Sequence, residues 1–510
     1  MQATHEMPPG RRLALTIVVM AATLIQVLDS TIANVALPHM QASLGAAPDT
    51  ITWVLTSYIV AAAIATPATG WLETVMGRRN LMAVAVGGFT IASMLCGAAT
   101  SLQMMVAARI AQGVFGAFLS PLAQSIMLDI YPEKDRPKAM GIWGMGVMIG
   151  PVLGPVLGGI LTDAYNWRWV FFINVPIGIL ALAGVFALLS DIERPKVRFD
   201  AIGFSLLALG LGAMQLALDR GTQLDWLDSS EIIVELGISG AMMWMFAVHT
   251  FTARNPLIPV ELFKDRNFVL ANLFFLVSMG VLVAASALLP PMLQSLLGYS
   301  TTYAGYMVMP RGVAMMISIL LVSRVASRID PRILVAFGMA LIGGSQWMMT
   351  GFSLEMDERP IIITGLIQGA GFGFIMVPMN LLAFATLPPQ FRTSGAAVWS
   401  LSRNIGASLT IAMFTALAAR NLQISHADLA STLSIIQYPI MQGGVAEQFG
   451  APTILAREFL DREVNRQALM ITYLDSFWLM SVMTLALIPF TLLLRVQKDK
   501  SANPEPMIVE

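Results

Sequence analysis

The sequence has little charge and very few of the side chains that bind metals. Charged residues make up 12% of the 510 residues, and cysteine occurs once, at Cys96. The four histidines are scattered, so no group of residues has metal-ligand spacing, and a single cysteine cannot form an intramolecular disulfide. None of the six lysines follows a glycine, so the phosphate-binding loop of ATPases is absent. We therefore expect no metal, no other cofactor and no ATP hydrolysis.

The sequence is instead rich in long apolar runs. Hydrophobic residues make up 56% of the chain, and a soluble domain carries roughly twice the charge seen here. A helix of about 20 apolar residues crosses the roughly 30 Å of hydrocarbon in a bilayer. We expect an all-α polytopic membrane protein, and a net charge of −1 gives no sign of a nucleic-acid partner. Fourteen transmembrane helices are predicted, at 13–37, 51–72, 80–99, 103–128, 139–161, 169–190, 201–220, 231–252, 268–289, 302–323, 333–351, 361–384, 396–417 and 470–494.

The basic residues are distributed unequally between the two sides of these helices. With the N-terminus in the cytoplasm, 20 of the 30 lysines and arginines fall on cytoplasmic segments and 7 on external ones. Because positive residues concentrate on the cytoplasmic side of membrane proteins, we expect both termini there. The first apolar run continues to about Pro38, which predicts a retained first span rather than a cleaved signal peptide.

The helices are expected to fall into three groups along the chain. Residues 1–190 hold six helices, 191–252 hold a charged linker and two inserted helices, and 253–510 hold the last six. A weak echo between GWLETVMGRR (70–79) and SRVASRIDPR (323–332) relates the first and last groups. Related halves with a site between them are typical of secondary transporters.

Segment 420–468 is the longest connection between the predicted helices. We expect it to be an external loop of amphipathic helices, broken at Tyr438-Pro439 and at Gly443-Gly444. Loops longer than about 15 residues usually have structure or function of their own. Two interpretations stay open, a passive cap over the outer mouth and a docking surface for a partner protein.

Two opposite charges are expected at a similar depth in the membrane. Asp29 lies roughly 24 Å from the inner face along its helix, and Arg109 lies roughly 20 Å from that face. Since each charge lowers the cost of burying the other, we expect the two side chains to be coupled. A buried carboxylate can be poised to bind and release protons. Asp29 and Arg109 are therefore predicted to couple transport to protons. The alternatives are binding of a substrate cation by Asp29, an Asp29 that stabilises the outer end of its helix, and a purely structural ion pair.

Other polar positions within the helices are candidates for a substrate pathway. Gln26 and Ser30 give the first helix a polar face beside Asp29, and Gln112 shares the helix face of Arg109. Arg311 and Arg403 are intramembrane cations in the last group, and each could contact a substrate anion, a carboxylate or a free carbonyl. The predicted pathway residues are Gln26, Ser30, Asn34, Gln112, Arg311, Gln368, Asn380 and Arg403.

The fifth predicted helix has a regular series of small residues. Glycines recur every four positions with two prolines between them, at Gly146, Gly150, Pro151, Gly154, Pro155 and Gly158. Glycines at this spacing let two helices approach closely, and prolines kink a helix. We expect a hinge between rocking halves, with helix packing alone as the alternative.

Four segments resemble motifs of the major facilitator superfamily, specifically its fourteen-helix drug:proton antiporters of the EmrB/QacA type. They are LDSTIANVALP (28–38), RIAQG (109–113), GPVLGPVLGG (150–159) and WRWVFFINVPIG (167–178). The likeness extends over nearly the whole chain. It implies the major facilitator fold, with two six-helix bundles and two inserted helices between them. It also implies export of amphipathic drugs or other toxic small molecules across the bacterial inner membrane, by alternating access and in exchange for protons.

The resemblance also implies partner proteins and a gating loop. EmrB-like pumps work with a periplasmic membrane-fusion adaptor and an outer-membrane channel, which segment 420–468 is expected to contact. The family's cytoplasmic gating loop corresponds here to Gly70, Glu73, Gly77, Arg78 and Arg79. Where that loop often has aspartate, this chain has Thr74, and an acidic residue stands one place earlier.

Two other functions stay open. A facilitator or exporter specific for one metabolite or siderophore would share the same fold. A membrane-embedded enzyme or sensor would need clustered catalytic side chains or a soluble signalling domain, and the sequence has neither. Transport is expected to be driven by the proton motive force, with membrane lipid as the surrounding medium.

Overall fold

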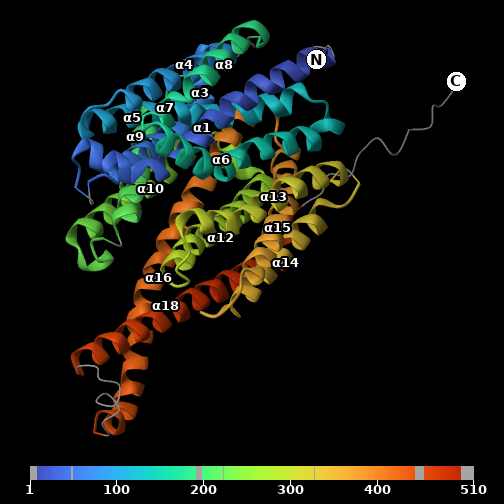
Figure 1. The fold of residues 1–510 in the computed structure, drawn as a ribbon. Helices are drawn as coiled ribbons and strands as arrows, with labels where there is room; N and C mark the ends of the chain where they lie inside the picture. The colour runs from blue at the N-terminus through green and yellow to red at the C-terminus, as the bar shows by residue number, and fades with distance from the viewer. Residues whose placement is uncertain are drawn as a thin grey trace, which may run out of the picture.

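The computed structural model of the protein is built of helices (Figure 1). It describes residues 8–47, 50–190, 198–221, 223–326, 328–442 and 453–494, and no strand occurs among them. The α-helices are α1 (Pro9–Leu44), α2 (Trp53–Ala65), α3 (Thr69–Met76), α4 (Arg78–Gly97), α5 (Leu102–Ile130), α6 (Arg136–Ala164), α7 (Trp169–Phe172), α8 (Asn174–Leu188), α9 (Ala201–Arg220), α10 (Ser230–Thr252), α11 (Glu261–Lys264), α12 (Arg266–Ser295), α13 (Thr301–Val325), α14 (Pro331–Met349), α15 (Glu358–Ala385), α16 (Arg392–Gln442) and α18 (Thr453–Ala486).

The ends of these helices follow from the local sequence. α1 begins with Pro9, where a missing backbone N–H costs no helical hydrogen bond, and ends at Gly45 with a φ of 61°. The side chains of Ser101, Asp265 and Ser300 accept backbone N–H bonds at the starts of α5, α12 and α13. Capping residues thus delimit the long apolar segments.

Thirteen helical stretches in the described part of the chain are long and apolar enough to cross a membrane. Each coincides with a transmembrane helix predicted from the sequence. The remaining predicted helix is α6, which has 29 residues and packs along α1 and α13. The all-α polytopic fold is therefore confirmed. The total of fourteen spans and the side on which the termini lie stay predictions.

The helices form two groups with an inserted pair beside the first (Figure 1). In the first group α1 packs on α6 and α8, and α5 packs on α2 and α4. In the second group α15 packs on α13 and α14, while α16 packs on α12 and α18. The inserted helices α9 and α10 pack on each other, and α9 also packs on α2.

The two groups meet at one end of the bundle, which we call the closed end. It comprises the C-terminal ends of α5, α13 and α15, the N-terminal ends of α6 and α16, and the whole of α3. Two glycines show how near the groups come. A Cβ atom on Gly70 would lie 2.2 Å from Ser394 Oγ, and one on Gly141 would lie 2.5 Å from Ser323 Cβ.

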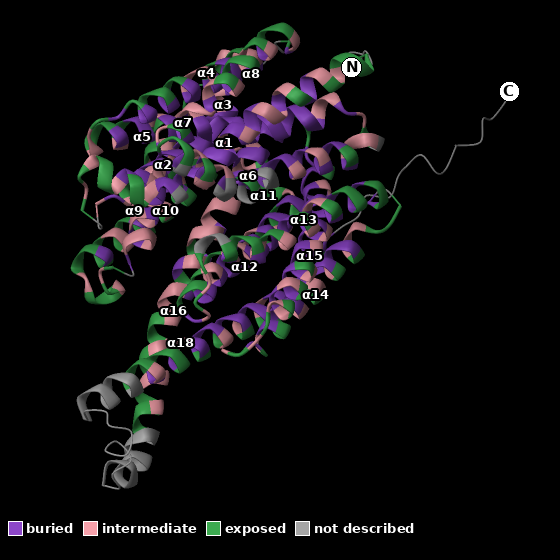
Figure 2. Ribbon diagram, viewed as in Figure 1, coloured by how far each residue is buried: buried purple, intermediate pink, exposed green. Residues whose placement is uncertain are grey.

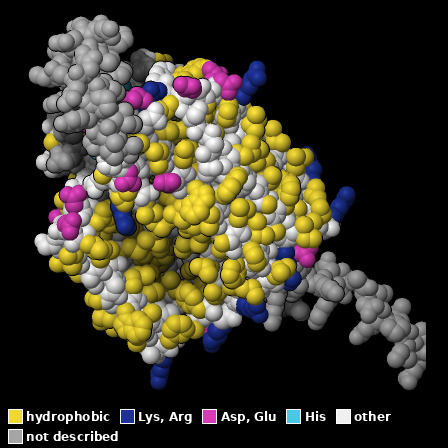
Figure 3. Space-filling view, turned by 90° about the horizontal axis from the view of Figure 1, so that it is seen from below, with side chains coloured by type: hydrophobic (Ala, Val, Ile, Leu, Met, Phe, Trp, Pro, Cys, Tyr) yellow, Lys and Arg dark blue, Asp and Glu magenta, His cyan; other side chains and the backbone are white. Residues whose placement is uncertain are grey.

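Apolar side chains cover the outside of the protein as well as its core. Leu180 and Trp244 are 72% and 73% exposed, and Figure 2 shows exposed residues along the outer sides of helices whose inner sides are buried. Figure 3 shows hydrophobic side chains over most of one face, charged side chains toward its rim and a hollow near its centre. Such an exterior suits lipid rather than water.

Segment 420–468 differs from the prediction. α16 runs without interruption from Arg392 to Gln442, so the predicted break at Tyr438-Pro439 is wrong, and α18 begins at Thr453. Residues 416–436 are rich in alanine and leucine, which favour continuation of the helix. The 51 residues of α16 extend over about 77 Å, far more than the thickness of the hydrocarbon. α16 and α18 therefore project from the end of the bundle opposite the closed end (Figure 1). Gly443-Gly444 lies outside the described residues.

Candidate functional site

Asp29 of α1 is fully buried and lies against Arg109 of α5. Asp29 Oδ2 is 2.6 Å from Arg109 Nη1, and the two residues are 0% and 1% exposed. Gln112 Nε2 donates a hydrogen bond to Asp29 Oδ1 at 2.8 Å, and Asn174 Nδ2 donates to the same oxygen at 3.0 Å. The contact between Asp29 and Arg109 predicted from their depth is confirmed. Three side-chain donors compensate the carboxylate in a place that excludes water.

The guanidinium of Arg109 is held from several sides. Its Nε donates to the carbonyl oxygen of Val54 on α2 at 2.9 Å, and Nη1 also donates to Gln112 Oε1 at 2.8 Å. Its Cζ atom lies 4.3 Å from the centre of the Tyr58 ring and 5.8 Å from that of Phe171. Aromatic faces attract a desolvated cation. Arg109 therefore ties α1, α2 and α5 together.

Ser93 and Asn174 belong to the same buried group of polar side chains and were not predicted. Ser93 Oγ on α4 accepts from Gln112 Nε2 at 3.2 Å and from Asn174 Nδ2 at 2.9 Å, and it donates to a backbone carbonyl at 2.9 Å. Asn174 is the one polar residue in VFFINVPIG, a signal that could have identified it, whereas Ser93 has no such signal. We call five residues the polar cluster: Asp29, Ser93, Arg109, Gln112 and Asn174.

The polar cluster contains one acidic and one basic side chain. A proton on Asp29 would remove the negative charge that Arg109 contacts. Breaking a buried ion pair costs about 3–5 kcal/mol, so protonation favours a rearrangement of α1 against α5. No group of His, Cys, Asp and Glu side chains that could hold a metal ion occurs among the described residues. The arrangement therefore suits proton transfer coupled to helix movement.

The other polar residues predicted on α1 lie outside the polar cluster. The Ser30 hydroxyl donates to the carbonyl of Val27 in its own helix at 2.8 Å, and Asn34 is exposed. Gln26 is half-buried, and its side chain interacts with Tyr58 rather than with Asp29. The structure thus brings Gln112 to Asp29, but not Gln26, Ser30 or Asn34.

Arg311 and Arg403 are the predicted cations of the second group. Arg311 Nη1 on α13 donates to Gln368 Oε1 on α15 at 3.1 Å. Arg403 Nη2 on α16 donates to Ser400 Oγ on the same helix at 3.3 Å. Both arginines are partly exposed, and neither contacts a carboxylate among the described residues. They are therefore available to a negatively charged group.

Asn380, another predicted pathway residue, lies where the two helix groups touch. It is 1% exposed, and its Oδ1 atom accepts a hydrogen bond from Gln124 Nε2 of α5. A second hydrogen bond across the same contact joins the hydroxyls of Ser125 and Thr393 at 2.8 Å. In this conformation Asn380 therefore helps to hold the groups together.

The glycines of α6 bring this helix close to α1. A Cβ atom on Gly150 would lie 2.6 Å from Val27 Cγ1, and one on Gly154 would lie 2.2 Å from Thr31 Oγ1. The Thr31 hydroxyl donates to the carbonyl oxygen of Gly150 at 3.0 Å. This geometry is that of close helix packing. A hinge role stays a prediction for the whole set, Gly146, Gly150, Pro151, Gly154, Pro155 and Gly158.

The predicted gating loop belongs to a group of charges at the closed end. Arg78 Nε is 2.8 Å from Glu73 Oε1, and Arg78 Nη2 is 2.8 Å from Asp129 Oδ2. The other oxygen of Asp129 is 2.6 Å from Arg392 Nη1, on α16 of the second group. Gly77 starts α4 with a φ of 78°, in the left-handed region that favours glycine. We call Glu73, Arg78, Asp129 and Arg392 the charge network.

The structure shows what replaces the aspartate that the family's loop pattern often has at the position of Thr74. Thr74 donates its hydroxyl to the carbonyl of Trp71 in its own helix at 2.7 Å, while Glu73 supplies the carboxylate that contacts Arg78. Arg79 lies elsewhere, with its Cζ atom 5.4 Å from the centre of the Phe186 ring. The loop therefore keeps an acidic partner for Arg78 from a neighbouring position.

A membrane-spanning bundle in two groups, with a buried charge pair inside one of them, is typical of secondary transporters. Residues 19–411 match the Major Facilitator Superfamily, and the chain belongs to that family. The family assignment and the apolar helices together identify a multi-pass protein of the inner membrane.

Curated relatives and a solved structure agree with this assignment. The chain is 33% identical over 493 residues to the multidrug export protein EmrB of Escherichia coli strain K12, covering 96% of each chain. It is 34% identical over 437 residues to the fatty acid resistance protein FarB of Neisseria gonorrhoeae, covering 84% of this chain and 85% of that one. The crystal structure of the human organic anion transporter MFSD10 superimposes with a TM-score of 0.61 at 15% identity, covering 94% of this chain and 100% of that one, which shows a shared fold.

Proposed function

We propose that this protein exports amphipathic small molecules from the cytoplasm in exchange for protons. The observation that carries the proposal is the fully buried contact between Asp29 and Arg109. A carboxylate at membrane depth costs several kcal/mol unless it is paired or protonated. Because only the ionised form of Asp29 attracts Arg109, the protonation state is tied to the packing of α1 against α5.

The proposed cycle alternates between two conformations. The closed end, which the basic residues predict to face the cytoplasm, seals that side in the present conformation. A proton from outside neutralises Asp29 and weakens its contact with Arg109. The helix groups then rock, the charge network separates, and the proton leaves to the cytoplasm as substrate enters. Ionised Asp29 regains Arg109, and the return movement carries the substrate outward.

The proton motive force is sufficient for this work. One pH unit corresponds to about 1.4 kcal/mol per proton. The membrane potential adds about 2.3 kcal/mol per charge for each 100 mV. Two protons at these values would support a substrate gradient well above a hundredfold.

The substrates are proposed from the relatives and from Arg311 and Arg403. EmrB is named for multidrug export and FarB for fatty acid resistance, which supports export of amphipathic compounds. A narrower exporter, specific for one metabolite with an acidic group, is the second candidate. Arg311 and Arg403 favour it, because both are partly exposed at membrane depth without a carboxylate partner among the described residues.

Partner proteins are also part of the proposal. α16 and α18 project beyond the membrane-spanning region at the end opposite the closed end (Figure 1). We infer that this projection contacts a periplasmic membrane-fusion adaptor, and through it an outer-membrane channel. Co-purification of such an adaptor with the full chain, but not with a variant lacking 425–465, tests this part separately.

The central test replaces Asp29 by asparagine, which keeps the shape of the side chain and removes the charge. In proteoliposomes with an imposed pH gradient, Asp29→Asn is expected to bind substrate and to exchange it down its gradient, but not to move it uphill. Asp228→Asn makes the same chemical change at an exposed position, and is expected to export normally. Uphill export by Asp29→Asn at the wild-type rate would remove Asp29 from the mechanism.

A further inference from the structure

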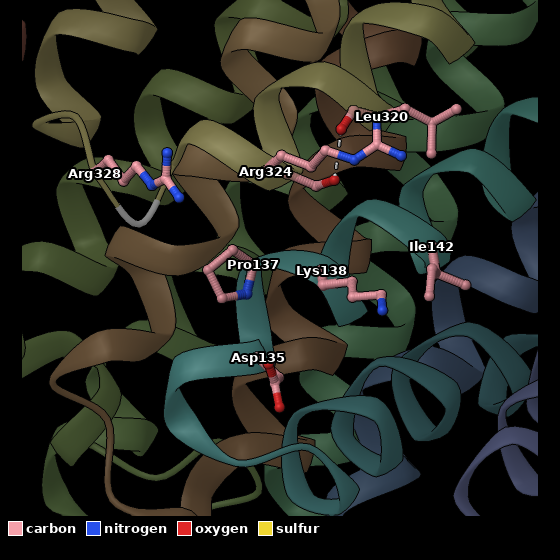
Figure 4. A pocket seen from close by; sticks show the side chains of 8 residues that line it. Asp135, Pro137, Lys138, Ile142, Leu320, Arg324 and Arg328 are labelled. Carbon is pink, nitrogen blue, oxygen red and sulfur yellow. Dashed lines mark hydrogen bonds between the residues drawn. The ribbon is translucent and has the colours of Figure 1, made fainter. Parts of the chain in front are cut away.

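A cavity at the closed end is not used by the proposed transport cycle. It has a volume of about 500 Å³ and lies between α6 of the first group and α13 of the second. Figure 4 shows residues from both sides facing it, among them Lys138 of α6 and Arg324 of α13. Because each helix group supplies one wall, a molecule held there would touch both groups.

The charged residues of this cavity are mainly basic. Lys138, Arg324 and Arg328 line it and are exposed, and none forms an ion pair with a described residue. Among the described residues that line the cavity Asp135 is the one carboxylate, and Figure 4 shows it on the far side of the cavity from the two arginines. Three cations against one anion leave a net positive site.

The cavity changes from charged to apolar with depth. Ile142 lies four residues after Lys138 on α6, and Leu320 lies four residues before Arg324 on α13. Each is therefore about one helical turn deeper in the bundle than the cation of its own helix. Leu320 is 38% exposed, so this apolar wall reaches the outer surface.

This gradient fits one chemical class of ligand. Arginine and lysine bind phosphate oxygens through charge-assisted hydrogen bonds. A free anion would need only the cationic rim, whereas a phospholipid also needs an apolar wall for the start of its acyl chains. Basic pockets between membrane helices on the cytoplasmic side bind anionic headgroups.

We propose that the cavity between α6 and α13 binds the phosphate headgroup of an anionic membrane phospholipid. Lys138 binds the phosphate from the first group, Arg324 and Arg328 bind it from the second, and Ile142 and Leu320 contact the acyl chains. The bound lipid bridges the groups where Gly141 and Ser323 already touch. Opening of the closed end has to break this bridge, so the lipid stabilises the conformation described here.

The experiment measures lipid retention by the full chain, and does not depend on export. The protein is equilibrated with equal amounts of phosphatidylglycerol and phosphatidylcholine, and the retained lipid is identified by native mass spectrometry. The test variant is Lys138→Gln, Arg324→Gln, Arg328→Gln. The control variant, Arg254→Gln, Lys264→Gln, Arg266→Gln, removes the same charge from exposed positions that do not line the cavity.

The wild type and the control variant are expected to retain phosphatidylglycerol in preference to phosphatidylcholine. The test variant is expected to bind it about a hundredfold more weakly, since each cation near an anionic lipid contributes roughly fivefold. Equal loss in both variants would overturn the site, because net charge alone would explain it. Displacement of the lipid by inorganic phosphate at similar concentration would overturn the assignment to a lipid.

A second readout follows the closed end itself. Spin labels on cysteines introduced at Glu133 and Ile329, both exposed and on opposite sides of the cavity, report the separation of the groups; buried Cys96 stays in place. Phosphatidylglycerol is expected to shift the distance distribution toward the short, closed population in the wild type but not in the test variant. The same distribution with and without phosphatidylglycerol in the wild type would overturn the stabilising role.

Discussion

Asp129 and Arg392 are 263 residues apart in sequence, and their side chains meet across the boundary between the two helix groups. Asp129 Oδ1 is 2.6 Å from Arg392 Nη1, and Asp129 Oδ2 is 2.8 Å from Arg78 Nη2. One carboxylate therefore connects the predicted gating loop of the first group to the start of α16 in the second. Any movement that opens the closed end has to separate Asp129 from Arg392.

The first prediction concerns this carboxylate. Asp129→Asn removes a charge that two arginines contact, and a hydrogen bond to a charged group contributes about 2 kcal/mol. Because Asp129 is 21% exposed, we expect a shift of up to roughly thirtyfold toward the open form. Ser394 lies against Gly70 in this conformation, so a cysteine introduced there becomes accessible when the closed end opens. A water-soluble thiol reagent should therefore label it faster in Asp129→Asn than in the wild type.

The matched control for this prediction is Glu133→Gln. Glu133 also lies at the closed end, but its side chain is 81% exposed and contacts Arg136 of its own group. Labelling at position 394 is expected to stay at the wild-type rate in the control. If Asp129→Asn and Glu133→Gln label equally slowly, the charge network does not hold the closed end.

The sequence is sufficient for the parts of this structure that depend on one helix at a time. The lengths of the apolar runs predict the helices, and the rise along a helix places Asp29 and Arg109 at one depth. The structure then shows the two side chains 2.6 Å apart. The depth of a charged residue in the membrane is a useful guide to its partner, because few other groups of opposite charge are available to it there.

The parts that depend on packing between distant segments could not be predicted. Ser93 contacts Gln112 and Asn174 only because α4, α5 and α8 pack together. Asp129 contacts Arg392 only because the two helix groups meet at the closed end. A local sequence pattern reflects only the preferences of neighbouring residues. It therefore does not predict contacts that depend on how the whole bundle packs.

The second prediction concerns Asn174, the unpredicted donor to Asp29. Asn174→Ala removes a hydrogen bond of 3.0 Å that stabilises the ionised carboxylate. Such a bond contributes about 1.5–3 kcal/mol, so the pH of half-maximal transport should rise by about one unit or more. Transport rates in proteoliposomes across a pH series give the measurement. Asn80→Ala, at an exposed asparagine of α4 that donates to the carbonyl oxygen of Met76 at the end of α3, should leave the pH profile unchanged.

The third prediction uses two glycines of α6 that are five residues apart. A Cβ atom on Gly154 would lie 2.2 Å from Thr31 Oγ1, whereas one on Gly159 would have no atom within 4 Å. Gly154→Ala should destabilise the protein by about 1–3 kcal/mol through overpacking, and Gly159→Ala should not. Thermal unfolding in detergent distinguishes them. Equal melting temperatures for the two variants would mean that α6 is free to move away from α1.

The fourth prediction concerns Asp200, which precedes α9. It accepts backbone N–H bonds from Gly203 at 2.8 Å and from Leu257 at 3.0 Å, and its Oδ1 is 2.7 Å from His249 Nε2. Burial acts to raise the pKa of Asp200, but these hydrogen bonds and the charge of His249 outweigh it and hold the pKa below its usual value. The resulting stability is present above about pH 4 and is lost as the pH falls through the lowered value.

Asp200→Asn should therefore be less stable than the wild type near pH 6, and the difference should shrink as the pH falls below about 4. Thermal unfolding of both proteins across this range is the measurement. Asp228→Asn, at an exposed position, is expected to track the wild type throughout. A difference between Asp200→Asn and the wild type that grows on acidification would contradict the assigned direction.

The fifth prediction tests whether Arg311 and Arg403 select the charge of the substrate. Each is a partly exposed cation at membrane depth with no carboxylate partner among the described residues, so a substrate anion gains more from either than a neutral molecule does. The probes are a fatty acid and its methyl ester, which have the same chain and differ in one charge. Arg403→Gln and Arg311→Gln should lower transport of the acid about tenfold or more and change transport of the ester little, since a charge-assisted hydrogen bond contributes about 1.5–3 kcal/mol.

Lysine at either position keeps the charge and should restore part of the loss. If the glutamine variants lose acid and ester in equal measure, the arginines support the helices of the second group, and recognition of the substrate rests on its apolar part alone.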